Sequence, residues 1–157
     1  MTLNELADTL PSGFHDCELK RLEVDYVART IRLGMSILVG DPDAKPEQRD
    51  NVRDATVDIS GLLFLIIDPP DHAPASGEEI WIVDGYETKE ILGYSKGIDP
   101  RLLESLPGDA FSYSFFVNDW NSYIHIAAKN CSLIWNGPER GYPGKRQHFS
   151  PGQTIDI

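Results

Sequence analysis

The chain has 157 residues, of which 41% are hydrophobic and 25% are charged, and its formal net charge is −11 at pH 7. These values predict one folded domain that can bury a core without the help of disulfide bonds or bound metal ions, and they exclude a disordered chain. A nucleic-acid ligand is disfavoured because phosphate binding needs a basic surface, and the longest apolar run, residues 62–67, is far shorter than the roughly 18 residues of a membrane span.

The negative charge is concentrated in the middle of the chain. Residues 41–109 contain 16 acidic and 6 basic residues, whereas residues 17–40 and 110–157 each carry one excess basic residue. An acidic surface keeps a protein soluble, and it also favours docking to a basic partner, since complementary charge raises the association rate. Both interpretations stay open at this point.

The first predicted element is a short helix over residues 2–10. Thr2 and Glu5 match a capping box, and apolar residues recur at helical spacing up to the break at residues 11–13. A helix of this length is not stable alone, so its apolar stripe is expected to pack on a sheet.

A long β-hairpin is predicted over residues 14–39. Apolar and polar residues alternate strictly in both of its halves, which is typical of strands with one buried face. Its connection near residues 27–30 lacks Gly and Asn, which favours a longer loop built on a type I turn.

The middle of the chain is predicted to alternate between strands and loops. Residues 40–54 form a surface loop, and a third strand begins near Asp54 and continues into the apolar run 62–67, with a bulge or a change of face near Gly61. A short strand at 80–83 is expected to end in an Asp84–Gly85 turn. The segment 86–98 fits either a strand or an irregular crossing.

The last third of the chain opens with a helical turn capped by Asp99. A second hairpin follows over residues 111–128, with its loop at 118–121, and a strand over 131–135. The Gly- and Pro-rich residues 136–157 are expected to form an ordered C-terminal arm, held by the domain's own surface or by a second copy of the chain, and residues 154–157 could add an edge strand.

These elements predict one domain over residues 1–157 that is mainly β. Six or more antiparallel strands with a short N-terminal helix and one further helical turn favour a β-sandwich or an open barrel, and an α+β fold is the alternative.

Two places in the sequence combine histidine with carboxylates. His15 and Asp16 are adjacent where the chain enters its first strand, but neighbours in a strand point to opposite faces, so direct contact between them is not expected. Asp68, Asp71 and His72 offer metal ligands within five residues, yet their spacing matches no established metal motif. We predict an acidic, Pro-rich turn there and no metal.

Trp120 and Tyr123 lie at and beside the loop of the second hairpin. Aromatic side chains in such loops either form binding surfaces or cap the end of a core, and the sequence does not decide between these roles. Trp81 and Trp135 fall within strands and are expected in the core. The chain has no phosphate-binding loop, nucleophile elbow or C-x-x-C pair, and no catalytic residue or cofactor is predicted.

The two cysteines, Cys17 and Cys131, lie in apolar, strand-like segments, and the N-terminus has neither the basic nor the apolar region of a secretory signal. We therefore expect a cytoplasmic protein with two reduced, buried thiols.

The stretch GFHDCELKRLEVDYVARTIRLGMSI, within residues 13–39, resembles the opening of small bacterial proteins of unknown function that are grouped with the immunity proteins of polymorphic toxin systems. The shared pattern is a short helix, a His-Asp pair and a hairpin of the form L-x-x-L-x-V-D…T-I-x-L, and SYIHIAAKNCSLIW is a fainter echo. The resemblance implies a cytosolic, non-enzymatic protein that binds another protein, and it transfers no catalytic residue.

Two functions of different class follow from the sequence. The first is a non-catalytic protein-binding module, of immunity type, whose acidic central segment neutralises a basic partner. Its candidate binding residues share an acidic or aromatic side chain in the loops and turns: Asp41, Asp43, Asp50, Asp54, Trp120 and Tyr123. The second is a small-ligand-binding domain or an unrecognised hydrolase, with a site near His15, Asp68, His72 and Trp120 at one end of the sandwich.

Overall fold

The computed structural model describes residues 1–71, 73 and 79–142. All of the predicted arm beyond residue 142, including the suggested strand at 154–157, lies outside these residues. Among the described residues, no helix combines the length and apolar character that crossing a membrane requires.

The described chain is built on one antiparallel sheet of nine strands, as the mainly β prediction requires. In chain order the strands are β1 (Cys17–Asp25), β2 (Thr30–Leu38), β3 (Asn51–Ser60), β4 (Phe64–Ile67), β5 (Ile80–Glu87), β6 (Phe111–Val117), β7 (Ser122–Ala128), β8 (Asn130–Trp135) and β9 (Arg140–Gly141). Their order across the sheet is β4-β7-β6-β5-β1-β2-β3-β8, with β9 beside β3. Because β4 and β8 remain its two edges, the sheet is not a closed barrel.

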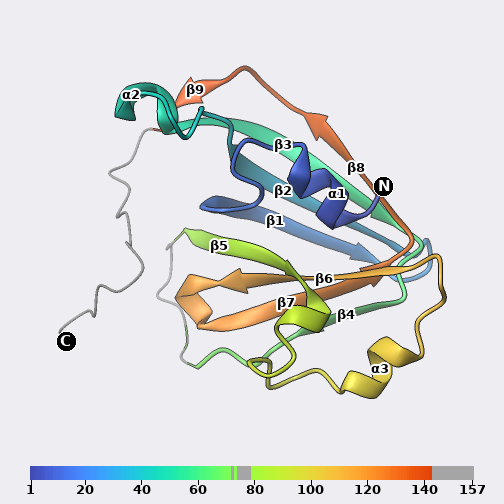
Figure 1. Ribbon diagram of the computed structural model, residues 1–157. Coiled ribbons are helices and arrows are strands. Elements are labelled where there is room, and N and C mark those ends of the chain that lie inside the picture. The colour runs from blue at the N-terminus through green and yellow to red at the C-terminus, as the bar shows by residue number, and fades with distance from the viewer. Residues whose placement is uncertain (72, 74–78, 143–157) are drawn as a thin grey trace.

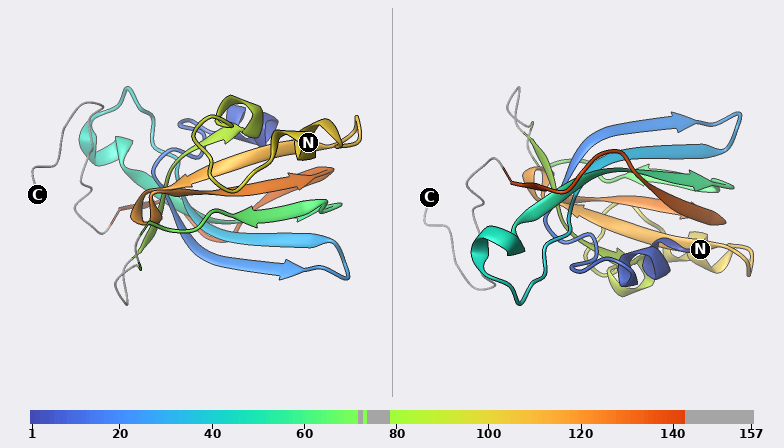
Figure 2. Two further views of the ribbon diagram at one scale, coloured as in Figure 1. Left: turned by 90° about the horizontal axis from the view of Figure 1, so that it is seen from below. Right: turned by 90° about the horizontal axis from the view of Figure 1, so that it is seen from above.

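The sheet folds over on itself where β1 meets β5. These strands share only three residue pairs, Cys17–Leu19 against Ile80–Ile82. The half made of β1, β2, β3 and β8 therefore faces the half made of β4, β5, β6 and β7 (Figures 1 and 2). Inward side chains of both halves form one core, as the alternation predicts. Its fully buried members include Ile31, Leu33, Met35, Ile37, Ile59, Phe115, Ile124 and Ile126.

Helix α1 (Leu3–Asp8) covers the opening between the two halves, where it contacts β8 and β6 (Figure 1). The predicted capping box is present, since the Thr2 hydroxyl accepts from the Glu5 amide at 3.1 Å and the Glu5 carboxylate accepts from the Thr2 amide at 2.8 Å. Leu3 and Leu6 are buried against the sheet. Packing, together with the cap, thus stabilises a helix too short to persist alone.

Both predicted hairpins are confirmed, as β1–β2 and β6–β7. The first turn needs no glycine, because the Asp25 carboxylate accepts from the amides of Val27 and Ala28 and Arg29 takes the left-handed conformation at φ 57°. The strand after the second hairpin, β8, leaves its neighbour β7 and pairs with β3 on the other half.

Several sequence predictions were wrong in detail. The expected loop over residues 40–54 contains helix α2 (Pro46–Arg49), and β3 already begins at Asn51. Asp84–Gly85 is not a turn but lies within β5, next to a bulge. The apolar run after Gly61 does not extend β3, since Gly61 turns the chain at φ 67° and β4 joins the opposite edge of the sheet.

The ambiguous segment after β5 is an irregular crossing. It begins with the 3-10 turn η1 (Thr88–Glu90) and ends at helix α3 (Pro100–Glu104), whose first turn is capped by the Asp99 carboxylate as predicted. It passes over the outer face of β6 and β7, away from the core (Figure 1). This crossing segment, residues 88–99, decides the environment of the candidate site.

Candidate functional site

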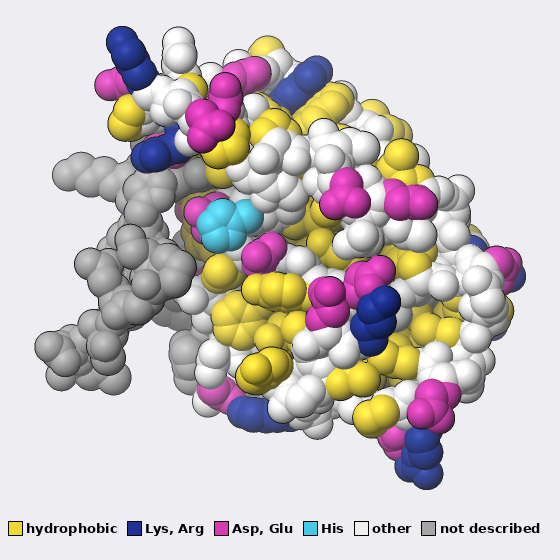
Figure 3. All heavy atoms as spheres, viewed as in Figure 1, with side chains coloured by type: hydrophobic (Ala, Val, Ile, Leu, Met, Phe, Trp, Pro, Cys, Tyr) yellow, Lys and Arg dark blue, Asp and Glu magenta, His cyan; other side chains and the backbone are white. Residues whose placement is uncertain are grey.

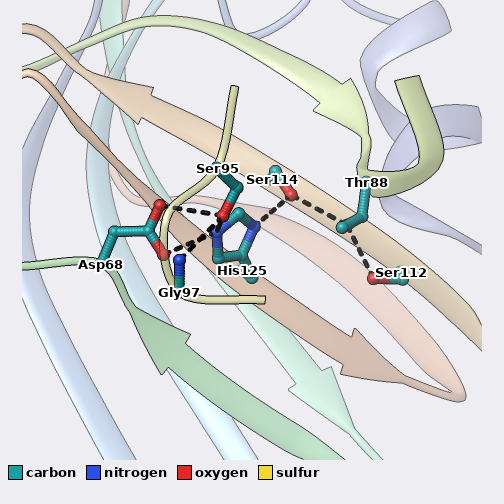
Figure 4. Close-up of polar contacts among 7 residues, drawn as sticks. All are labelled: Asp68, Thr88, Ser95, Gly97, Ser112, Ser114 and His125. Atoms are coloured by element: carbon teal, nitrogen blue, oxygen red, sulfur yellow. Dashed lines mark hydrogen bonds and ion pairs between the residues drawn. The ribbon is translucent and has the colours of Figure 1, made fainter. Parts of the chain in front are cut away.

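A buried carboxylate–imidazole pair lies beneath the crossing segment. Asp68 directly follows β4, and His125 stands on the outer face of β7, the neighbouring strand. The Asp68 amide donates to the Tyr123 carbonyl at 2.9 Å, which holds its side chain beside His125. Nε2 of His125 is 3.0 Å from Oδ1 of Asp68 (Figure 4), and the two residues are 0% and 2% exposed.

Four hydroxyl groups extend this pair on both sides. On one side, the Ser95 hydroxyl donates to Oδ2 of Asp68 at 3.0 Å and accepts from the Gly97 amide at 3.3 Å. On the other side, Nδ1 of His125 is 2.7 Å from the hydroxyl of Ser114. The Ser95 hydroxyl also lies 2.9 Å from Nε2 of His125, and the remaining links join Ser114 to Thr88 at 2.8 Å and Ser112 to Thr88 at 2.6 Å (Figure 4).

The hydrogen bonds are consistent with one direction of donation. The Ser112 hydroxyl donates to Thr88. If Thr88 then donates to Ser114, and Ser114 donates to Nδ1 of His125, each of these three hydroxyl groups has a hydrogen-bond acceptor. The imidazole then carries its proton on Nε2, where the N–H can donate to the Asp68 carboxylate, which can only accept, and to the Ser95 hydroxyl. The network therefore fits neutral His125. Burial lowers the pKa of His125 below its usual value, and attraction to Asp68 offsets only part of that effect.

The order carboxylate, imidazole, hydroxyl is that of a proton relay in hydrolases, but here no substrate can reach it. Ser114 and His125 are both 0% exposed, and Thr88 is too. The chemistry that the network can perform is structural. It joins the crossing segment, through Thr88 and Ser95, to β6, β7 and the end of β4, and a fully satisfied polar network of this kind specifies one arrangement.

The structure corrects the expectation for His15 and Asp16. Asp16 precedes β1 and has a left-handed backbone at φ 52°, so the two side chains do not alternate as they would in a strand. Nε2 of His15 lies 3.4 Å from the Asp16 carboxylate, and the side chains are 50% and 35% exposed. They form a solvated surface pair.

No hydrogen bond or ion pair joins the side chains of His15, Asp68 and Trp120, the described residues of the proposed small-ligand or hydrolase site. Asp68 bonds to His125, whereas Asp71 bonds to Lys96 at 2.8 Å and to Asn121 at 2.6 Å on the surface. His72 lies outside the described residues. Within the described part of the chain, no group of three or more His, Cys, Asp or Glu residues could hold a metal ion.

Of the two aromatic candidates, Trp120 packs against the core from the 3-10 turn η2 (Asn118–Trp120). Tyr123 stays half-buried on the outer face of β7, stacked on His125 with ring centroids 5.7 Å apart and next to Phe116 at 5.1 Å. Trp120 thus caps one end of the core, which is one of its two predicted roles. Tyr123 covers the buried pair and retains an accessible edge.

The four aspartates proposed for docking have different surroundings. Asp41 and Asp43 are exposed before α2, and Asp50 lies beside Arg49, 3.8 Å away. Asp54 is engaged on the outer face of β3 by Ser36, by Lys20 at 3.0 Å and by Arg140 at 3.0 Å. Although burial alone would raise the pKa of Asp54, these hydrogen bonds lower it to about 2.

Another set of acidic residues gathers on the face formed by α1, β5 and η1, and we call it the acidic face. It consists of Asp8, Asp84, Glu87 and Glu90, and Lys89 lies among them, 2.7 Å from Glu87. Burial and the charges of Asp84, Asp8 and Glu90 raise the pKa of Tyr113, which lies beneath this face. Figure 3 shows separate acidic side chains on this side of the molecule, among hydrophobic and uncharged ones, with one basic side chain beside two of them.

The sequence analysis missed His125 as a site residue. The alternation of β7 places His125 on the face opposite the core, where a histidine is expected to meet water. One signal was available. Ser112, Ser114 and Ala127 occupy the same face, and such a surface of small residues allows another segment to pack closely on the strands.

Comparisons with protein-family models, with curated proteins and with solved structures gave no match to this chain.

Proposed function

We propose that this chain is a non-catalytic protein-binding module of immunity type, which neutralises a basic partner protein by covering it with the acidic face. The observation that carries the proposal is the concentration of Asp8, Asp84, Glu87 and Glu90 around Tyr113, with Lys89 among them. Three of the four carboxylates belong to residues 41–109, the segment in which the sequence concentrates its negative charge.

The electrostatics of the acidic face support this function. Among the described residues, Asp8, Asp84 and Glu90 take part in no ion pair, so their charge is available to a partner. Asp54 and Asp58, by contrast, are already paired with basic side chains. An unneutralised acidic surface attracts a basic protein over about 8–10 Å at physiological salt and raises its association rate.

We also propose that the protein is located in the cytoplasm, which is a reducing compartment. Cys17 and Cys131 are both buried and not joined in a disulfide, which suits a protein kept away from disulfide-forming conditions. The contacts do not favour the small-ligand or hydrolase alternative, because the side chains of its described residues, His15, Asp68 and Trp120, are not hydrogen-bonded to one another.

The test is co-expression with toxin genes encoded beside the gene for this chain, read as rescue of growth, followed by titration calorimetry with the purified toxin. The variant Asp84→Lys/Glu90→Lys should weaken binding by about tenfold or more at low salt and abolish rescue. The matched control is Asp41→Lys/Asp43→Lys, which raises the net charge of −11 by the same 4 units on exposed residues elsewhere.

Equal losses in the two variants would mean that net charge alone acts and that the acidic face is not the binding surface. If no neighbouring toxin is neutralised by the unaltered chain, the immunity function itself is refuted.

A further inference from the structure

A groove of about 320 Å³ opens between α1, η1, α3 and the start of β6, beside the acidic face. Its apolar lining comes from Leu103, Leu106, Ala110 and Phe111, none of which is fully buried. Figure 3 shows hydrophobic side chains on this face between η1 and α3, next to the acidic ones. The groove thus presents apolar surface to solvent next to acidic side chains.

The groove also contains polar groups from its acidic side. Asn4 and the paired side chains of Glu87 and Lys89 line it, and so does Tyr113, which is only 2% exposed. Burial and the nearby charges of Asp84, Asp8 and Glu90 raise the pKa of Tyr113, and these charges favour an occupant that brings cationic groups with it.

From this lining we infer that the groove anchors the partner of the proposed function by a segment in which an apolar side chain is flanked by lysine or arginine. The apolar side chain fills the space against Leu103, Leu106 and Phe111, and the flanking cations meet the carboxylates of the acidic face. The inference rests on the proposed function and adds to it the chemistry of the recognised segment. Charge complementarity excludes an acidic segment from the same place.

A purely electrostatic face would attract basic proteins without distinguishing among them. An apolar pocket within that face adds specificity, because binding energy at interfaces is concentrated in a few side chains that enter desolvated pockets. The surrounding charges then speed association, and the buried anchor slows dissociation.

Three fluorescein-labelled peptides test the anchor by fluorescence anisotropy with the full chain. The first has one leucine between four lysines, the second replaces the leucine with serine, and the third replaces the lysines with glutamate. We expect the leucine peptide to bind about tenfold more tightly than the serine peptide, and the glutamate peptide not to bind.

The groove is then filled by Ala110→Trp, and Ser105→Trp is the matched control because Ser105 is exposed on the same α3 end but does not line the groove. Ala110→Trp should make the leucine and serine peptides bind equally weakly, and Ser105→Trp should leave their difference unchanged. Urea unfolding of both variants verifies that they remain folded.

Equal binding of the leucine and serine peptides to the unaltered chain would overturn the groove inference, and so would an undiminished preference in folded Ala110→Trp. If that result accompanies weakened toxin binding by Asp84→Lys/Glu90→Lys, the proposed function stands without the groove. If growth rescue fails while the leucine preference is observed, the groove binds such segments and the immunity function is the part that is refuted.

Discussion

Replacing Asp68 with alanine should destabilise the protein more than any other single loss of a polar side chain in the network. The carboxylate accepts two hydrogen bonds, from Nε2 of His125 and from the Ser95 hydroxyl, each at 3.0 Å. Both bonds are charge-assisted, and such bonds contribute about 1.5–3 kcal/mol each. Their loss leaves the Ser95 hydroxyl, 2.9 Å from Nε2, as the remaining acceptor for the buried imidazole N–H of His125.

From these contributions we expect Asp68→Ala to lower the free energy of unfolding by about 3–4 kcal/mol. Asp68→Asn keeps the shape and one acceptor oxygen, so its cost should be about 1–2 kcal/mol. The control is Asp71→Ala, three residues away, whose exposed pair with Lys96 should contribute less than about 1 kcal/mol.

Urea unfolding measures all three variants, and hydrogen exchange locates the effect. Because Asp68 is joined to the crossing segment through Ser95, amides of residues 88–99 should lose protection in Asp68→Ala before those of β2 and β3 do. If Asp68→Ala costs no more than Asp71→Ala, the buried network does not stabilise the fold, and the reasoning from burial and hydrogen bonding is wrong.

Three further predictions follow from other sites. Because the pKa of His125 is lowered in the folded state, the unfolded chain binds a proton at this residue more readily. Stability should therefore hold above pH 6.5 and fall as the pH drops below it. Urea unfolding measured from pH 8 to 5 should show that stability depends less on pH in His125→Gln. The lowered pKa of Asp54, about 2, adds stability that is present above pH 4 and lost between about pH 4 and 2. Because the Asp54 side chain is 39% exposed, Asp54→Asn should lower the free energy of unfolding by only about 1 kcal/mol at pH 7. No change in that free energy would show that the hydrogen bonds of Asp54 do not persist in solution. Gly85→Ala should lower the free energy of unfolding by about 1–3 kcal/mol, because a Cβ at this position would collide with the Tyr113 hydroxyl. Gly93→Ala is the control and should be nearly neutral, since no atom lies near its Cβ position. Equal melting temperatures of the two variants would contradict the close packing at Gly85.

The strands with one buried and one exposed face were predictable from the sequence alone. In β2 and β3 the side chains alternate between the core and solvent, so the pattern of apolar residues reports the strand directly. The capping residues Thr2 and Asp99 were equally readable, because a cap is a local interaction between residues two or three positions apart.

The same reasoning failed where the environment is set by distant parts of the chain. Asp84–Gly85 reads as a turn, yet the dipeptide is held in β5 because Gly85 leaves room for the Tyr113 side chain from β6. The run after Gly61 reads as more of β3, but it reaches the opposite edge of the sheet and pairs with β7.

The sequence by itself determined that this protein is an antiparallel β domain with a capped N-terminal helix, two hairpins and an acidic centre, since each of these follows from local spacing and composition. Only the tertiary structure decided that His125 meets Asp68, 57 positions away, and that Asp8 lies near Asp84, Glu87 and Glu90 on one face. The physical reason is that alternation reports which side of a strand a residue occupies but not what covers that side. The crossing segment covers one outer face and buries a histidine there, and it leaves the acidic residues at its start exposed to a partner.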